Sequence, residues 1–241
     1  YINIYVADKL MEQAQDLTYN VNSMSRLYST EYSGKVGSDQ LEPYKYTLQE
    51  DMEFLSQDEA NIVNTRKDYS DGKLVHTSTD FYTNGYYYYV DNDDKKLKTE
   101  MTLDEYFGGE EEEDDIVDID LGDIDISIVT IGPMIDERAP KNIESDDKGN
   151  ATISYTESGD SYKRLALREL TFMLYYDYTE KELKEASINV SDVKVTDYIK
   201  NGYYVGYSLE YKITAYVAGD KVILNIKDST EILSPGKEIK V

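Results

Sequence analysis

The opening residues carry apolar side chains at the spacing of an α-helix. These side chains follow one another at intervals of four, four and three residues: Val6, Leu10, Ala14 and Leu17. Such a stripe predicts a helix over residues 5–17 that packs through one face. Residues 161–176 combine leucines with charged side chains in a similar way, and predict a second amphipathic helix.

After the first predicted helix, apolar and polar positions alternate every second residue, which is the period of a β-strand. The dipeptides Asp71-Gly72 and Asn84-Gly85 separate successive alternating runs. Both favour the tight turns of β-hairpins because they accept positive φ angles. Residues 18–101 are therefore predicted to form an antiparallel meander.

The second half of the chain, residues 141–241, has a similar order of elements. A hairpin is predicted around residues 147–150, and two further turns at Asn201-Gly202 and at residues 218–220. Two sequences have the form of a capping box, in which a side-chain oxygen and a carboxylate satisfy the first N–H groups of a helix. These are residues 102–105 and 179–182, and each predicts a short helix.

Residues 102–140 form an insert between the two β-rich halves and include the most acidic stretch of the chain. Between Glu110 and Asp125 there are ten acidic side chains and no basic one. The apolar residues of this stretch fit both a helix and a strand, so its structure stays open. Calcium binds six to eight oxygens, and alternate carboxylates can supply them. The candidate calcium ligands are Asp118, Asp120, Asp123 and Asp125; the alternative is a solvated acidic loop.

Composition excludes several classes of function. The chain has 49 acidic and 25 basic residues, a net charge of −24. Nucleic acids and anionic membrane surfaces bind clustered Lys and Arg, so neither is an expected partner. There is no Cys, which excludes thiol catalysis and thiolate metal sites. His76 is the one histidine, and no motif of a hydrolase or nucleotide-binding site accompanies it. We expect a protein that is not an enzyme and has no cofactor, with calcium as the one candidate ion.

Tyrosine dominates the aromatic residues, with 25 Tyr against 4 Phe and no Trp. A sheet face rich in tyrosine suits sugar stacking, a protein partner, or a groove lined with hydroxyl groups. The candidate ligand-binding residues are Tyr86, Tyr88, Tyr207 and Tyr211. The alternative is that cross-strand tyrosine pairs stabilise the sheet.

The order of elements resembles a known family group. The segments that suggest it are residues 81–90, at the end of the first meander, and residues 211–226 and 235–241 near the end of the chain. The chain has, in order, a helix, a meander, a helical insert and a second meander. This order resembles the LolA-like lipoprotein-carrier fold and its secreted Gram-positive relatives. The resemblance implies an α+β fold: a strongly curved antiparallel sheet, or open half-barrel, with helices covering the concave face. We expect residues 1–241 to form a single domain.

The resemblance also suggests a function. We expect an exported binding protein that holds a lipid or other amphipathic ligand between sheet and helices. Its expected location is extracellular, at the cell surface, with contact to the membrane only through a lipid anchor upstream of Tyr1. The alternative is a cell-surface interaction module that holds a protein or glycan partner on an acidic or Tyr-rich face, with calcium as a modulator.

Overall fold

The computed structural model describes residues 2–56, 58–91, 96–107 and 140–241. The helices are α1 (Ile2–Tyr19), α2 (Leu103–Phe107), α3 (Lys163–Leu174) and α4 (Glu180–Lys184), and a 3₁₀ turn (Gly159–Tyr162) precedes α3. The strands of the first half are β1 (Ser23–Val36), β2 (Asp39–Gln40), β3 (Tyr44–Phe54), β4 (Ala60–Ser70), β5 (Lys73–Thr83), β6 (Tyr86–Asp91) and β7 (Lys96–Glu100). Those of the second half are β8 (Asn142–Ser145), β9 (Ala151–Thr156), β10 (Ser187–Lys200), β11 (Tyr203–Val217) and β12 (Asp220–Ile232).

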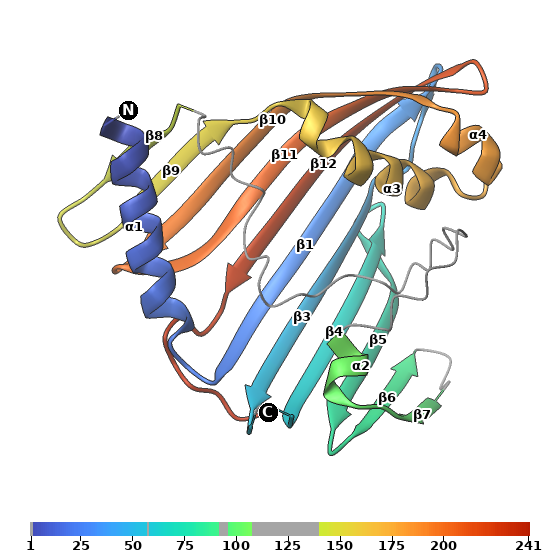
Figure 1. The fold of residues 1–241 in the computed structure, drawn as a ribbon. Helices are drawn as coiled ribbons and strands as arrows, with labels where there is room; N and C mark the ends of the chain where they lie inside the picture. Colours follow the sequence, from blue (N-terminus) through green and yellow to red (C-terminus); the bar gives the residue numbers. More distant parts are fainter. Residues whose placement is uncertain (1, 57, 92–95, 108–139) are drawn as a thin grey trace.

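The described strands form one 12-stranded antiparallel sheet (Figure 1). Its order is β7-β6-β5-β4-β3-β1-β12-β11-β10-β9-β8, with β2 paired to β1. Each half of the chain is a meander, as predicted, and the two meanders are joined where β1 pairs with β12. Because β7 and β8 are edge strands of this order, the sheet is open rather than closed into a barrel.

Turn chemistry explains the hairpins. Asp71, Asn84 and Asn201 have φ angles of 48°, 50° and 53°, and the glycine that follows each of them is also in the positive region. Asn, Asp and Gly tolerate this conformation best, which is why these dipeptides mark two-residue hairpin turns. These predicted turns are confirmed.

The helices lie on one face of the sheet (Figure 1). Helix α1 contacts β11 and β8, and α3 contacts β10. Phe172 of α3 packs against Tyr32 of β1, with ring centroids 5.5 Å apart. Tyr106 of α2 packs against Tyr82 of β5 at 5.1 Å. We call this the helix-side face, and the opposite face the outer face.

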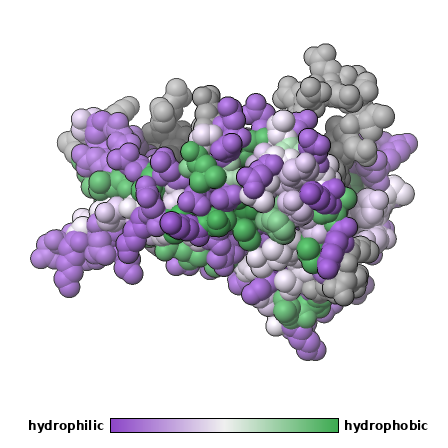
Figure 2. All heavy atoms as spheres, turned by 90° about the horizontal axis from the view of Figure 1, so that it is seen from below, coloured by the Kyte–Doolittle hydropathy of each residue, from purple (hydrophilic) through white to green (hydrophobic). Residues whose placement is uncertain are grey.

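Two apolar clusters stabilise the helix-side face. The larger one joins α1 and α3 to strands β9–β12 and includes Ile213, Leu224 and Leu170, all with no exposed surface. The smaller one lies under α2 and includes Met52 and Ile62. Viewed from below, apolar atoms gather in the middle of the molecule and hydrophilic atoms surround them (Figure 2).

Helix α1 differs from the sequence prediction in phase and length. Val6 and Leu17 are 41% and 53% exposed, whereas Ala7, Met11 and Ala14 are buried. The predicted stripe is therefore only partly correct: Leu10 and Ala14 pack against the core, whereas Val6 and Leu17 do not. Small side chains let the helix lie close to the sheet, so alanines rather than the largest apolar residues face the sheet. The helix also continues through the predicted strand start, and β1 begins only at Ser23.

The other predicted helices agree with the structure. The hydroxyl and carboxylate of residues Thr102 and Glu105 make the reciprocal bonds of a capping box before α2. Thr179 and Glu182 do the same before α4. The helix predicted over residues 161–176 is α3, preceded by its 3₁₀ turn. Within the described residues, no helix has the length and apolar character needed to cross a bilayer.

Candidate functional site

The four predicted ligand-binding tyrosines do not line one site. Tyr211 of β11 lies in the core beside Tyr162 and is 3% exposed. Tyr207 lies four residues earlier on the same strand and also belongs to the helix-side face. Tyr88 of β6 instead stacks on Phe81, on the outer face, and Lys98 lies 4.1 Å from the ring centre of Tyr86. The structure therefore separates the two pairs onto opposite faces of the sheet.

The candidate calcium ligands Asp118, Asp120, Asp123 and Asp125 lie outside the described residues. In the part of the chain that the structure describes, no group of three or more acidic or histidine side chains is arranged to hold a metal ion. The helix and strand alternatives for this stretch therefore stay open.

Four polar side chains cross the helix-side face in one line, one on each of four adjacent strands. Register places Arg26 of β1 opposite Glu50 of β3, Glu50 opposite Asn64 of β4, and Asn64 opposite Asp80 of β5. Arg26 and Glu50 are 1% and 0% exposed, and Asn64 is 4% exposed. We call these four residues the polar row.

Hydrogen bonds satisfy only part of the polar row. Nε of Arg26 donates to Oε1 of Glu50. The Asn64 side-chain amide donates to the Asp80 carboxylate at 2.9 Å and to the Tyr106 hydroxyl at 2.8 Å. Three buried atoms have no hydrogen-bond partner: Nη2 of Arg26, Oε2 of Glu50 and Oδ1 of Asn64. Each such atom costs about 1–3 kcal/mol if it stays unsatisfied.

Further buried polar atoms on this face also lack partners. They are the hydroxyl oxygens of Tyr19 and Tyr211. Buried polar groups in native proteins are nearly always hydrogen-bonded, to protein, water or ligand. The helix-side face therefore combines an apolar core with several buried polar atoms that no protein group satisfies.

Acidic groups outnumber their basic partners on the same face. Asp80, Asp197 and Asp228 form no ion pair with a basic side chain of the described residues. Burial raises the pKa of Asp80 and of Asp197 to about 6, and burial and nearby Glu169 raise the pKa of Asp228 to about 7. Burial also raises the pKa of Glu50, against the opposing effect of Arg26.

Tyrosine rings surround the polar row. The guanidinium carbon of Arg26 lies 5.0 Å from the ring centre of Tyr28. At the other end, Tyr106 lies 6.1 Å from the ring of Tyr87 and contacts Tyr82. Aromatic faces attract cations, so this arrangement suits a charged group enclosed by rings.

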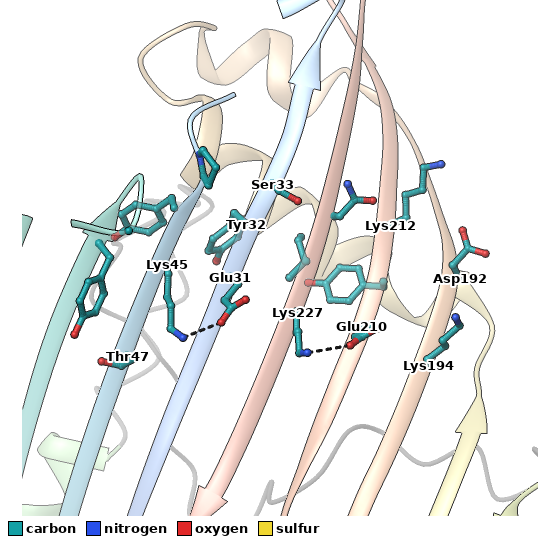
Figure 3. Close-up of a pocket in the computed structure, with 17 residues that line it drawn as sticks. Glu31, Tyr32, Ser33, Lys45, Thr47, Asp192, Lys194, Glu210, Lys212 and Lys227 are labelled. Atoms are coloured by element: carbon teal, nitrogen blue, oxygen red, sulfur yellow. Dashed lines mark hydrogen bonds and ion pairs between the residues drawn. The ribbon is translucent and has the colours of Figure 1, made fainter. Parts of the chain in front are cut away.

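The outer face carries a second candidate site, a groove of about 800 Å³ (Figure 3). A line of alternating charge crosses five adjacent strands through it: Lys45, Glu31, Lys227, Glu210 and Lys194. Lys45 pairs with Glu31 at 2.8 Å and Lys227 with Glu210 at 3.3 Å. Among the described residues, Lys194 forms no ion pair. A second groove of about 880 Å³ shares Glu210 and Lys227 with the first.

Sequence reasoning missed the polar row, although a signal was present. Arg26 lies six residues before Tyr32, and Glu50 lies two residues before Met52, so the charged side chains share the face of buried ones. A charged residue in phase with the apolar positions of a strand is the pattern that points to a buried polar site.

Comparisons with known proteins give no family assignment. No family model matches the chain, and no curated protein matches it. A solved LolA superfamily protein from Nitrosomonas europaea is similar over 97% of this chain and 94% of its own, at 9% identity and a TM-score of 0.23. A beta-barrel-like protein from Brucella abortus covers 89% of this chain and all of its own, at 8% identity and a TM-score of 0.19.

An acyl-CoA thioesterase II from Mycobacterium marinum covers 98% of this chain and 91% of its own, at 8% identity and a TM-score of 0.14. At scores this low, the likeness to the LolA superfamily is loose, and membership of this chain in any family is not established.

Proposed function

We propose that this chain is a non-enzymatic binding protein that holds an amphipathic ligand between the helix-side face of the sheet and the helices. The observation that carries the proposal is the polar row, in which Arg26, Glu50 and Asn64 each bury one polar atom without a partner. In this proposal the sheet acts as an open half-barrel, and its concave face is the helix-side face.

The row has the chemistry expected for such a ligand. A ligand head group that reaches Nη2 of Arg26 and Oε2 of Glu50 would recover the free energy lost by their burial. Apolar side chains flank the row on the same strands, with Leu48 and Met52 on either side of Glu50. These side chains offer an apolar surface for a hydrocarbon tail, worth about 25 cal/mol per Å² removed from water.

Native mass spectrometry with lipid extraction tests this proposal. The gently purified protein is expected to carry a bound amphiphile that organic solvent releases, and to take up a fluorescent fatty acid once emptied. Leu48→Phe is expected to reduce uptake severalfold by filling space beside the polar row, whereas Thr47→Phe, on the outer face of the same strand, leaves uptake unchanged. A protein without adduct and without uptake would contradict the proposal.

Export to the cell surface, with a lipid anchor upstream of Tyr1, belongs to the same proposal. The acidic composition, with abundant Tyr, Asn, Ser and Thr, supports an extracellular location. Detergent phase partitioning of the protein produced from its full gene tests the anchor. Recovery in the detergent phase is the expected result, and recovery in the aqueous phase would contradict it.

The second candidate function is an interaction module that binds a protein or glycan partner on the outer face. The observation that favours it is the pair of adjoining grooves, which offer charged and hydroxyl groups side by side (Figure 3). Binding that Lys194→Gln weakens and that lipid does not displace would support this function. Calorimetry with calcium, on the parent and on the Asp118→Asn/Asp120→Asn variant, tests calcium as its modulator.

A further inference from the structure

The polar row holds more negative than positive charge. Arg26 is its one cation and pairs with Glu50, whereas the second carboxyl group, that of Asp80, lies beyond Asn64 on β5. A buried charge without a partner is strongly unfavourable, so such groups are normally paired. A positive charge supplied by the ligand would complete the pairing.

The unsatisfied atoms define the complementary group more closely. Nη2 of Arg26 is a donor, and it suits a phosphate or carboxylate oxygen of the ligand. Oε2 of Glu50 and Oδ1 of Asn64 are acceptors, and they suit the N–H groups of an ammonium. Because neighbouring strands lie about 4.8 Å apart, the donor and these acceptors follow one another across the sheet at short, regular steps.

The aromatic rings near the acceptor end of the row also suit a bound cation. Tyr106 accepts a hydrogen bond from Asn64 and packs against Tyr82 and Tyr87, so rings gather at the acidic end of the row. Carboxylates and aromatic faces together form the usual surroundings of a bound ammonium group. At the opposite end, the guanidinium of Arg26 provides the site for an anion.

We propose that the polar row binds a zwitterionic head group, with its oxyanion at Arg26 and its protonated amine between Glu50, Asn64 and Asp80. This inference rests on the proposed binding of an amphipathic ligand, and it specifies the chemical class of that ligand. A lipid with an aminoalkyl phosphate head group has the required pair of charges. A free zwitterion has the same pair without a hydrocarbon tail.

Binding of three defined probes tests the inference. Two are lysophosphatidylethanolamine and lysophosphatidylglycerol with the same acyl chain, and the third is glycerophosphoethanolamine, which has the head group alone. We expect lysophosphatidylethanolamine to bind about tenfold more tightly than lysophosphatidylglycerol, about 1.4 kcal/mol, because its amine makes charged hydrogen bonds that a glycerol head group lacks.

Two variants test whether the polar row causes the preference for lysophosphatidylethanolamine over lysophosphatidylglycerol. Asp80→Asn keeps the shape of the side chain and removes its charge, and it is expected to abolish most of the preference for lysophosphatidylethanolamine. Glu50→Gln should act in the same direction. Glu31→Gln removes one carboxylate from the outer face of β1 and is expected to leave the preference unchanged. Circular dichroism verifies that each variant folds.

The outcomes separate this inference from the proposed function. Equal binding of the two lysolipids, or tighter binding of lysophosphatidylglycerol, would overturn the zwitterionic head group and leave the carrier function in place. An equal loss of both lysolipids in the folded Asp80→Asn protein would also overturn it. Failure of both lysolipids to bind the parent protein would overturn the proposed function. Equal affinity for glycerophosphoethanolamine would support the head-group site and contradict the need for a tail.

Discussion

Buried carboxyl groups are the most unusual residues of this protein. Asp197 is 2% exposed and accepts a hydrogen bond from the Tyr204 hydroxyl at 3.2 Å. No basic side chain of the described residues forms an ion pair with it. Because burial favours the neutral form, the folded state retains protons on Asp197 and Asp80 at pH values where the unfolded chain has released them.

This difference predicts a stability that falls as the pH rises. The ordinary pKa of an aspartate is 3.8, and burial raises that of Asp197 and Asp80 to about 6 and that of Asp228 to about 7. Between these values the folded state binds more protons than the unfolded state, so the free energy of unfolding decreases as pH increases. The stabilisation is complete below about pH 4 and is lost as the pH passes through about 6 to 7.

Urea denaturation near pH 5 and near pH 8 measures the effect. We expect a free energy of unfolding that is a few kcal/mol higher at the lower pH. Asp197→Asn should reduce the difference, whereas Asp39→Asn, at an exposed position, should leave it unchanged. A stability that is equal or greater near pH 8 would contradict the burial of these carboxyl groups.

The buried pair of Arg26 and Glu50 makes a second prediction at the residue scale. Arg26→Met leaves the Glu50 carboxylate buried without its cation, which should cost about 3–5 kcal/mol of stability. Arg26→Met combined with Glu50→Leu removes both charges and should recover most of that loss.

The exposed ion pair of Lys45 and Glu31 on the outer face supplies the control. Lys45→Met breaks an exposed ion pair with Glu31 and should cost about 1 kcal/mol or less. Urea unfolding of the variants compares the two pairs. If the double variant is no more stable than Arg26→Met alone, the loss of stability does not come from a Glu50 carboxylate buried without its cation.

At the scale of elements, local sequence signals predicted turns and caps better than helix phase. Asn84-Gly85 and Asn201-Gly202 specify hairpin turns through their own backbone preferences, independently of the rest of the fold. The capping box at Thr179 is equally local. The buried side of α1 is decided by the sheet beneath it, which explains why only Leu10 and Ala14 of the predicted stripe pack against the core.

Substitutions on α1 test the corrected phase. Ala7 has no exposed surface and lies outside the predicted stripe, so Ala7→Leu should destabilise the protein by about 1–3 kcal/mol through overpacking. Leu17 is 53% exposed, so Leu17→Ala should change the free energy of unfolding by no more than about 0.5 kcal/mol. Thermal unfolding measures both. The reverse order of effects would restore the stripe predicted from the sequence.

At the scale of the whole molecule, the pairing of β1 with β12 creates the surface on which the account depends. Val36 lies opposite Val222 and Arg26 opposite Ile232, so the first strand and the last strand share eleven facing positions. A pairing between residues about 200 positions apart leaves no local signal. The sequence therefore predicted the two meanders, and the resemblance predicted that they join into one curved sheet. Neither predicted which polar side chains this sheet would bury.

The candidate site shows the same limit. The tyrosines of β6 alternate between faces, with Tyr86 and Tyr88 on the outer face and Tyr87 on the helix-side face. Which side chains of neighbouring strands lie next to one another depends on the register of every strand pair in the sheet. Arg26, Glu50, Asn64 and Asp80 come from four strands, and only the assembled sheet brings them into one row.

A crystal structure of the protein purified gently from its producing cells would show whether an amphipathic ligand lies on the helix-side face. We expect elongated electron density on that face, with one end within hydrogen-bond distance of Arg26 Nη2 and Glu50 Oε2. Density for ordered water alone at these atoms, with side chains filling the space beside them, would contradict the binding of an amphipathic ligand.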